Sequence, residues 1–324
     1  MNQNDIDLKK TAVHVGTTML IFLLLFYTLF PLFELLVEPL ASVLAGEWLG
    51  HVISRLLFGV IYAVVFIAPA RLFMRLSKNN DRRLYHTATF PSKNAAFIIM
   101  ATVAITMSCA YVNSWLGTIF GVSNPPSVPT DTVTPIDFLL LTFTTAIVPA
   151  FCEEILFRKT LLRALLPYGE GFAIISSALL FGLMHQNAFQ VFYATMAGIV
   201  IGYAYVKTNS FLCAFLIHFF NNLVSVIQQY MSSSLGEQTS LVAGSILTVA
   251  LSTLGLVSLI ILIFIEKNKK SVYETGSFGK IEAPSLLYTS KPVTINRAKV
   301  FFLSPTVLIF TIISAILAVL TLFS

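Results

Sequence analysis

Residues 19–33 read MLIFLLLFYTLFPLF, fifteen residues without a single charge. They lie inside a longer apolar stretch over 12–36. A helix needs about 20 apolar residues to cross the hydrocarbon core of a bilayer, so this stretch is long enough to span a membrane. It is longer than the apolar core of a signal peptide, and no small-x-small cleavage site follows it. We therefore interpret it as a retained transmembrane helix.

The rest of the chain has the same character. Of its 324 residues 56% are hydrophobic and only 11% are charged, whereas soluble domains average about 25% charged residues. This composition predicts an all-α, polytopic membrane bundle of eight or nine transmembrane helices whose main partner is the lipid bilayer. Nine spans would place the two termini on opposite faces. The predicted spans are 12–36, 49–71, 95–119, 137–160, 170–187, 188–206, 210–230, 240–265 and 300–323.

The positive charges predict the orientation. Lys and Arg residues cluster on alternate connections between the spans, and 19 of the 20 fall on one predicted face. Basic connections stay in the cytoplasm, so we expect a multi-pass protein of the cell membrane with a cytoplasmic N-terminus. The net charge of +5 then reflects topology and does not indicate a nucleic-acid partner. Arg55 is the exception: it either reaches the outer interface or pairs with Glu34, Glu38 or Glu47.

The three cysteines do not suggest a disulfide framework. Cys109, Cys152 and Cys213 are odd in number and lie in apolar segments. Cys152 directly precedes a pair of glutamates, but a buried cysteine usually acts as a small hydrophobic residue. We do not expect it to be a nucleophile.

The segment CEEILFR, residues 152–158, places three charges inside the fourth predicted span. Charged residues are expensive in a membrane, and they usually have a partner or a function. Glu154 and Arg158 are four residues apart, which puts them on one helix face and predicts an ion pair. Glu153 lies about 100° further around the helix. It has no partner on its own helix, which makes it the better candidate for a general base.

Three further polar residues occur in nearby spans. His185 ends the segment FGLMH, and His218 and Asn222 belong to the segment HFFNN. Counted from the cytoplasmic helix ends, Glu153 and Asn222 lie about 20 Å deep, His185 about 23 Å and His218 about 13 Å. Three helices therefore bring a carboxylate, two imidazoles and an amide to overlapping depths.

This set of groups suits hydrolysis. Glu153 and His185 can take a proton from water, and His218 and Asn222 can stabilise the oxyanion that forms on a carbonyl. The competing chemistry is a zinc site made of Glu153, His185 and His218. An HExxH motif is absent and the three candidate ligands come from separate helices. We therefore favour a site without metal or other cofactor.

The segments EEILFR, FGLMH and HFFNN resemble the EExxxR, FxxxH and HxxxN motifs of the CPBP intramembrane proteases. That family includes type II CAAX prenyl endopeptidases and bacteriocin-immunity and lysostaphin-resistance-like proteins. The resemblance divides the chain into N-terminal helices with a cytoplasmic loop (1–136), a protease core (137–230) and C-terminal helices with a second loop (231–324).

The resemblance also implies roles for individual residues. It implies that Glu153 and His185 activate water and that His218 and Asn222 bind the oxyanion. It implies that Glu154 and Arg158 give structural support. Lys159 departs from the family pattern, in which glycine often follows the arginine.

We therefore predict an intramembrane endopeptidase of the glutamic type that cleaves a membrane-associated peptide or protein. The aromatic-rich single chain suggests a bacterial source, in which prenylated proteins are not the expected substrate. The alternatives are a non-proteolytic scaffold that has a membrane protein as partner, such as a sensor kinase, or that confers bacteriocin self-immunity. A proton-coupled transporter is less favoured, because the polar residues cluster in one region and not in two matching halves.

Overall fold

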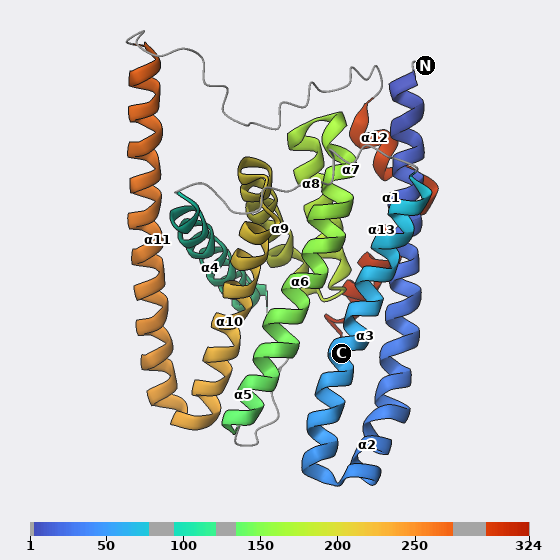
Figure 1. Cartoon of the computed structure of the whole chain (residues 1–324), viewed down its shortest axis with the longest axis vertical. Coiled ribbons are helices and arrows are strands. Elements are labelled where there is room, and N and C mark those ends of the chain that lie inside the picture. Colours follow the sequence, from blue (N-terminus) through green and yellow to red (C-terminus); the bar gives the residue numbers. More distant parts are fainter. Residues whose placement is uncertain (1–2, 78–93, 121–133, 275–295, 324) are drawn as a thin grey trace.

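The computed structural model of the 324-residue chain describes residues 3–77, 94–120, 134–274 and 296–323. In these ranges the chain consists of helices and short turns, without strands (Figure 1). The helices are α1 (Gln3–Leu32), η1 (Phe33–Val37), α2 (Glu38–Ala45), α3 (Glu47–Leu76), α4 (Ala95–Phe120), α5 (Pro135–Leu141), η3 (Thr142–Ile147), α6 (Val148–Glu154), η4 (Ile155–Leu162), α7 (Arg163–Leu165), η5 (Leu166–Tyr168), α8 (Glu170–Met184), α9 (Ala188–Thr208), α10 (Phe211–Leu235), α11 (Glu237–Glu274), α12 (Arg297–Phe302) and α13 (Pro305–Leu320).

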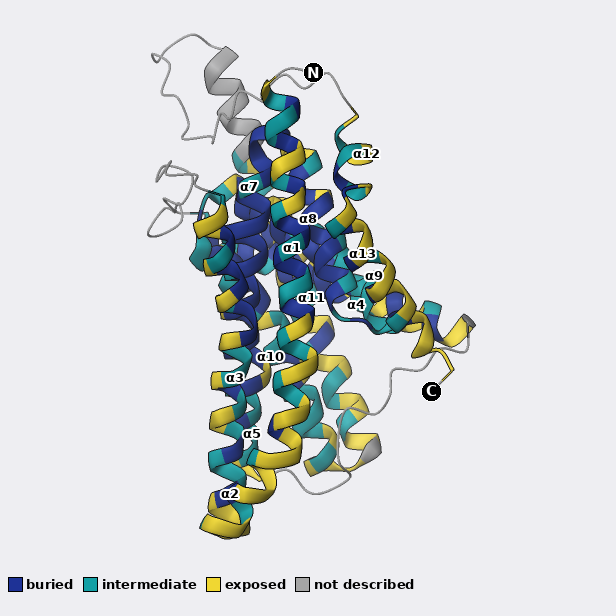
Figure 2. Cartoon of the chain, turned by 90° about the vertical axis from the view of Figure 1, so that its right-hand side faces the viewer, coloured by how far each residue is buried: buried dark blue, intermediate teal, exposed yellow. Residues whose placement is uncertain are grey.

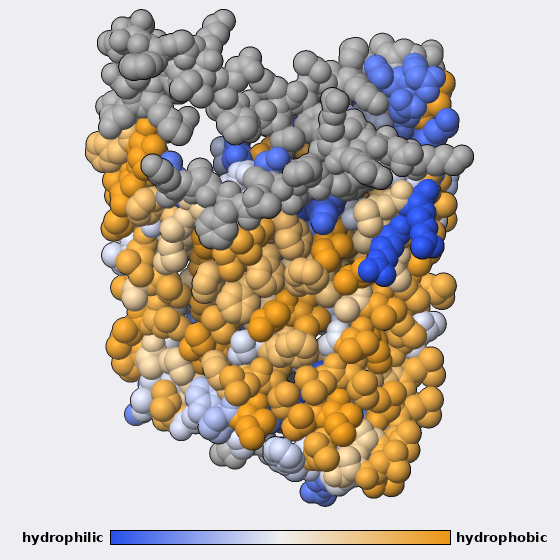
Figure 3. Space-filling model, in the orientation of Figure 1, coloured by the Kyte–Doolittle hydropathy of each residue, from blue (hydrophilic) through white to orange (hydrophobic). Residues whose placement is uncertain are grey.

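The bundle has the dimensions and surface of a membrane protein. Within the described ranges, seven helical stretches are long and apolar enough to cross a bilayer. Apolar side chains cover most of the visible surface, and hydrophilic residues gather toward its upper end (Figure 3). The chain is thus a multi-pass, all-α membrane protein, as its composition predicts. The seven stretches are Gln3–Ala45, Glu47–Leu76, Ala95–Ile119, Pro135–Tyr168, Ala188–Thr208, Phe211–Leu235 and Gln238–Ile265.

Two of the nine predicted spans are shorter than expected. The segments 170–187 and 300–323 contain α8, with 15 residues, and α13, with 16. At 1.5 Å per residue these helices are only about 22–24 Å long, against a hydrocarbon core of about 30 Å. Helix α13 accordingly ends above the lower ends of α2, α5 and α11 (Figure 1).

Helices α8 and α9 form a hairpin whose turn lies inside the bundle. At its open end, Lys207 Nζ lies 3.7 Å from Glu170 Oε2. At its closed end, the Ala188 N–H donates to Thr321 Oγ1 over 3.1 Å, which joins the turn to the end of α13. The open end of the hairpin points to the upper side in Figure 1, and its turn lies near mid-height.

The turn between α8 and α9 is well supplied with hydrogen bonds. Gln186 has a left-handed backbone (φ 50°), and Asn187 caps α9 by accepting from the Phe189 N–H over 3.0 Å. The Tyr27 hydroxyl of α1 donates to Gln186 Oε1, and Asn113 of α4 donates to the Phe189 carbonyl over 2.9 Å. Irregular backbone at membrane depth is tolerated only when protein surrounds it, and these contacts provide that environment.

The fourth span is not a regular α-helix. The π-helical segments η3 and η4 flank α6, and Thr160 Oγ1 donates to the carbonyl of Ile155, five residues earlier, over 2.8 Å. Pro149 has no N–H to give to the Thr145 carbonyl, as an α-helix would require. Such π segments often occur at functional sites, and here they border the two glutamates.

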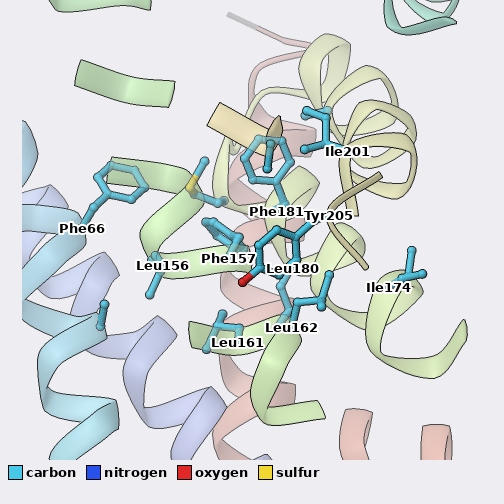
Figure 4. Packing of buried hydrophobic residues seen from close by; sticks show 14 of the residues in the cluster. Phe66, Leu156, Phe157, Leu161, Leu162, Ile174, Leu180, Phe181, Ile201 and Tyr205 are labelled. Carbon is cyan, nitrogen blue, oxygen red and sulfur yellow. The ribbon is translucent and has the colours of Figure 1, made fainter. Parts of the chain in front are cut away.

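The buried core occupies the upper half of the bundle (Figure 2). It is formed by large apolar side chains from α1, α3, η4, α8 and α9, several of which are drawn in Figure 4. Toward the lower end the helices are more exposed, as expected where lipid replaces protein. The residues labelled in Figure 4 are Phe66, Leu156, Phe157, Leu161, Leu162, Ile174, Leu180, Phe181, Ile201 and Tyr205.

Two of the 19 basic residues counted on one predicted face lie in the protein interior instead. Arg158 and Arg163 are buried, because the fourth span continues to Tyr168 and packs against α8 and α9. Arg163 donates to the Tyr205 hydroxyl and to Asn209 Oδ1. The three glutamates considered for Arg55 form no ion pair with it in the described part of the chain.

Candidate active site

The candidate site is built around α6, which ends with the two adjacent glutamates. Glu153 is 3% exposed and Glu154 is fully buried. Neighbouring residues on a helix point about 100° apart, so the two carboxylates meet different partners. Helix α6 packs against both α3 and α10, and each of these helices supplies one of the contacts described next.

Glu154 lies between a guanidinium and an imidazole. Arg158 Nε is 3.1 Å from Glu154 Oε2, as the spacing of four residues predicts. His218 Nδ1 is 2.8 Å from Glu154 Oε1. Arg158 makes no aligned hydrogen bond, and its guanidinium carbon lies 4.7 Å from the ring centre of Phe181. Two cationic or proton-bearing groups thus stabilise one buried carboxylate.

Glu153 has a partner from another helix, which its sequence position does not reveal. The Tyr62 hydroxyl of α3 donates to Glu153 Oε1. The other oxygen, Oε2, lies 3.8 Å from His218 Nε2 and has no hydrogen-bond partner among the described residues. One oxygen of the carboxylate is therefore held, and the other is available for chemistry.

His218 contacts both glutamates, one through each ring nitrogen. An ionised carboxylate can only accept hydrogen bonds, so the short contact to Glu154 requires a proton on Nδ1. In the neutral ring, Nε2 then carries the lone pair that faces Glu153. In the charged ring, Nε2 also becomes a donor. Glu154 therefore fixes the tautomer of His218.

His185 reaches the same cluster by way of an aromatic ring. Its ring centre is 5.3 Å from that of Phe181, and Phe181 is in turn 5.8 Å from His218. Glu153 and His218 both act electrostatically on His185. Phe181 is the first residue of the segment FGLMH, and its spacing of four from His185 puts both rings on one face of α8.

Asn222 makes a hydrogen bond that the sequence did not predict. Its Nδ2 donates over 3.1 Å to the carbonyl of Thr145. This is the carbonyl to which Pro149 cannot donate, so Asn222 stabilises the irregular helix at η3. The amide has a second N–H, so the oxyanion role of Asn222 stays a prediction.

The structure adds residues that the sequence reasoning did not select. Tyr62 bonds to Glu153, and Tyr27 bonds to Gln186 beside His185. Each tyrosine adds one hydroxyl group to a largely apolar span, and this is a weak signal in the sequence. The ring of a tyrosine fits an apolar helix, so its hydroxyl attracts attention only when its partner is known.

The donor geometry does not fit the zinc alternative. Among the described residues, no three His, Cys, Asp or Glu side chains are placed to hold a metal ion. Both nitrogens of His218 already face carboxylates, and one of them is within hydrogen-bond distance of Glu154. Glu153, His185 and His218 are therefore not arranged as zinc ligands.

An apolar pocket of about 320 Å³ lies between α3 and the fourth span. It is bordered by Gly59 and Ala63 of α3 and by Phe143, Val148 and Cys152 of the fourth span. Ala63 and Cys152 are the chain neighbours of Tyr62 and Glu153. Neither Tyr62 nor Glu153 lines the pocket, because neighbouring residues on a helix point about 100° apart.

The fold and the site together define a class: a multi-pass membrane protein with a buried cluster of carboxylates and imidazoles suited to hydrolysis. Residues 135–224 match the family model described as type II CAAX prenyl endopeptidase Rce1-like. The matched segment contains all three motifs, so the resemblance to CPBP intramembrane proteases is confirmed. At the family level, the chain is similar to CAAX-type intramembrane endopeptidases. No curated protein and no solved structure matches the chain.

Proposed function

We propose that this protein is a glutamic-type intramembrane endopeptidase that cleaves a membrane-associated peptide or protein. The observation that carries the proposal is the free oxygen of Glu153, which lies 3.8 Å from His218 Nε2 in a buried site. Glu154, the residue next to Glu153, forms an ion pair with Arg158, and the two balance each other's charge. Glu153 is then the carboxylate left to take a proton from water.

In the proposed mechanism, water attacks the peptide carbonyl while Glu153 Oε2 accepts one of its protons. His218, held by Glu154 through Nδ1, donates from Nε2 in its charged form and stabilises the developing oxyanion. His185 assists in orienting the water, in keeping with its position beside Phe181. Asn222 donates one amide N–H to the Thr145 carbonyl in the resting protein, and its second N–H is the donor left for the oxyanion.

The substrate class follows from the surroundings of the site. The position inside the bilayer favours a substrate with an apolar segment near the bond to be cleaved. We place the protein in the cell membrane with its basic face toward the cytoplasm. The active form needs no metal in this proposal.

The test is cleavage of a membrane-tethered peptide library by the purified protein in liposomes. We expect Glu153→Gln to lower kcat at least about 100-fold, because the general base is lost while the shape of the side chain is kept. Glu170→Gln is the matched control: it removes a glutamate from the surface pair with Lys207 and should leave cleavage unchanged.

Each outcome separates the alternatives. Cleavage that disappears in Glu153→Gln and persists with a zinc chelator supports the proposal. Cleavage by wild type that the chelator abolishes would favour the metal-dependent reaction. A folded wild-type protein that cleaves no member of the library would contradict the proposal and favour the scaffold.

A further inference from the structure

Tyr62 links the candidate site to a part of the chain outside the matched family segment. It lies on α3, and the match begins only at residue 135. Its hydroxyl donates to Glu153 Oε1, across a separation of 91 residues in sequence. The family resemblance therefore says nothing about Tyr62, and its role must be argued from its contacts.

The ring of Tyr62 is held firmly by other aromatic side chains. It stacks on Phe66 with ring centres 4.7 Å apart and planes inclined by 15°. Phe30 of α1 meets it edge-on at 6.0 Å, and Phe58 lies 6.1 Å away. Such contacts restrict both the position and the tilt of the ring. The hydroxyl at its tip therefore has a fixed location.

This fixed donor determines which oxygen of Glu153 can react. With Oε1 bound to Tyr62, the carboxylate cannot rotate freely about its last bond. The remaining oxygen, Oε2, is kept on the side of His218, 3.8 Å from Nε2 and without a hydrogen-bond partner. A base must be within hydrogen-bond reach of the water it activates, and misplacement by about 1 Å can cost about 100-fold in rate.

We propose that Tyr62 is a positioning residue of the reaction, which orients Glu153 so that its free oxygen faces His218 and the attacking water. The inference rests on the proposed function. It also assigns a purpose to the N-terminal helices: α3 supplies the hydroxyl and α1 supplies part of the aromatic packing that holds it. The matched segment alone would leave Glu153 without this support.

The test compares Tyr62→Phe with wild type in the liposome assay. Phenylalanine keeps the ring and its stacking on Phe66, so the thermal unfolding midpoint should hardly change. We expect kcat to fall about 10- to 100-fold while KM stays within about twofold, because only the orientation of the base is lost. Tyr111→Phe is the matched control, since it removes a hydroxyl that donates to Thr248 over 2.7 Å between α4 and α11.

A second measurement checks that Tyr62 acts through Glu153. The shorter side chain in Glu153→Asp should no longer meet the hydroxyl, so adding Tyr62→Phe to it should have little further effect on kcat. Infrared spectroscopy provides an arm that needs no activity. Tyr62→Phe should shift a carboxylate band that is missing from the spectrum of Glu153→Gln.

The failures are distinguishable. If wild type cleaves and Tyr62→Phe cleaves equally fast, the positioning role is wrong and the proposed function stands. An equal loss of kcat in Tyr62→Phe and Tyr111→Phe would also overturn it, by showing a general effect on packing. If wild type cleaves nothing, the proposed function fails, and an unshifted carboxylate band would show that Tyr62 does not hold Glu153 either.

Discussion

Adjacent glutamates have different partners here because a helix turns about 100° per residue. Glu154 faces α10 and Arg158, whereas Glu153 faces α3 and the hydroxyl of Tyr62. His218 contacts both. At the scale of single residues, the site is a set of ionisable side chains arranged around the imidazole of His218.

The pair Glu154–Arg158 leads to a prediction about stability. Both side chains are fully buried, so Arg158→Ala would leave a buried carboxylate with only His218 as partner. We expect a loss of about 3–5 kcal/mol in the free energy of unfolding, measured as a lower thermal midpoint in detergent. Lys159→Ala, at the next position but over the face of Phe211, should cost much less. Equal midpoints for Arg158→Ala and wild type would show that the pair does not stabilise the fold.

At the scale of elements, the close approach of α8 and α9 fixes the position of His185. Gly182 makes this approach feasible, because a Cβ atom there would lie 2.6 Å from the Val191 carbonyl oxygen and 2.0 Å from Thr195 Oγ1. Small residues at helix interfaces commonly allow such packing in membranes. The glycine in FGLMH is therefore required by packing and not by the chemistry.

Gly182→Ala should force the two helices apart. We expect a loss of about 1–3 kcal/mol in the free energy of unfolding, the usual cost of overpacking. Gly171→Ala tests the same substitution on the same helix where a new Cβ meets nothing within 4 Å, and it should be neutral or slightly stabilising. A thermal midpoint for Gly182→Ala as high as that of Gly171→Ala would contradict the packing argument.

The irregular fourth span is the other feature at this scale. Pro149 and the segments η3 and η4 interrupt the regular hydrogen bonding on both sides of α6. Asn222 donates to one of the carbonyls concerned, so a residue expected to act on substrate also stabilises the helix in the resting protein. The irregularity turns both glutamates inward at the point where α3 and α10 meet α6.

At the scale of the whole molecule, the distribution of basic residues predicts the orientation. Lys10 belongs to the N-terminal part of α1, whereas Ser234 belongs to the last turn of α10, and both are exposed. Helix α1 begins at the upper end of the bundle and α10 ends at its lower end (Figure 1). With the three native cysteines replaced, we expect Ser234→Cys to react with an impermeant maleimide in intact cells. Lys10→Cys should react only after permeabilisation. The reverse pattern would place the N-terminus outside and contradict the positive-inside assignment.

The family match covers only the middle of the chain, yet the site extends beyond it. Residues 135–224 contain the glutamates, the arginine, both histidines and Asn222. Tyr62 and Tyr27 come from α3 and α1, which lie outside the matched segment. The division of the chain into a core and two flanking parts remains a prediction, and these tyrosines show that the N-terminal part contributes contacts to the core.

The sequence by itself determined the class of fold, because apolar length alone is enough to identify helices that lie in lipid. It also determined the pairing of Glu154 with Arg158, which depends only on the spacing along one helix. It did not determine the contact of Tyr62 with Glu153 or of His218 with Glu154, which join residues 91 and 64 positions apart.

The physical reason lies in the solvent. In water, an apolar stripe marks the face of a helix that packs inward, but in lipid both faces are apolar. The sequence therefore does not show which side of α3 meets α6, or that α8 stops short of the opposite face. Only the tertiary packing decides these points, and with them which atoms surround Glu153.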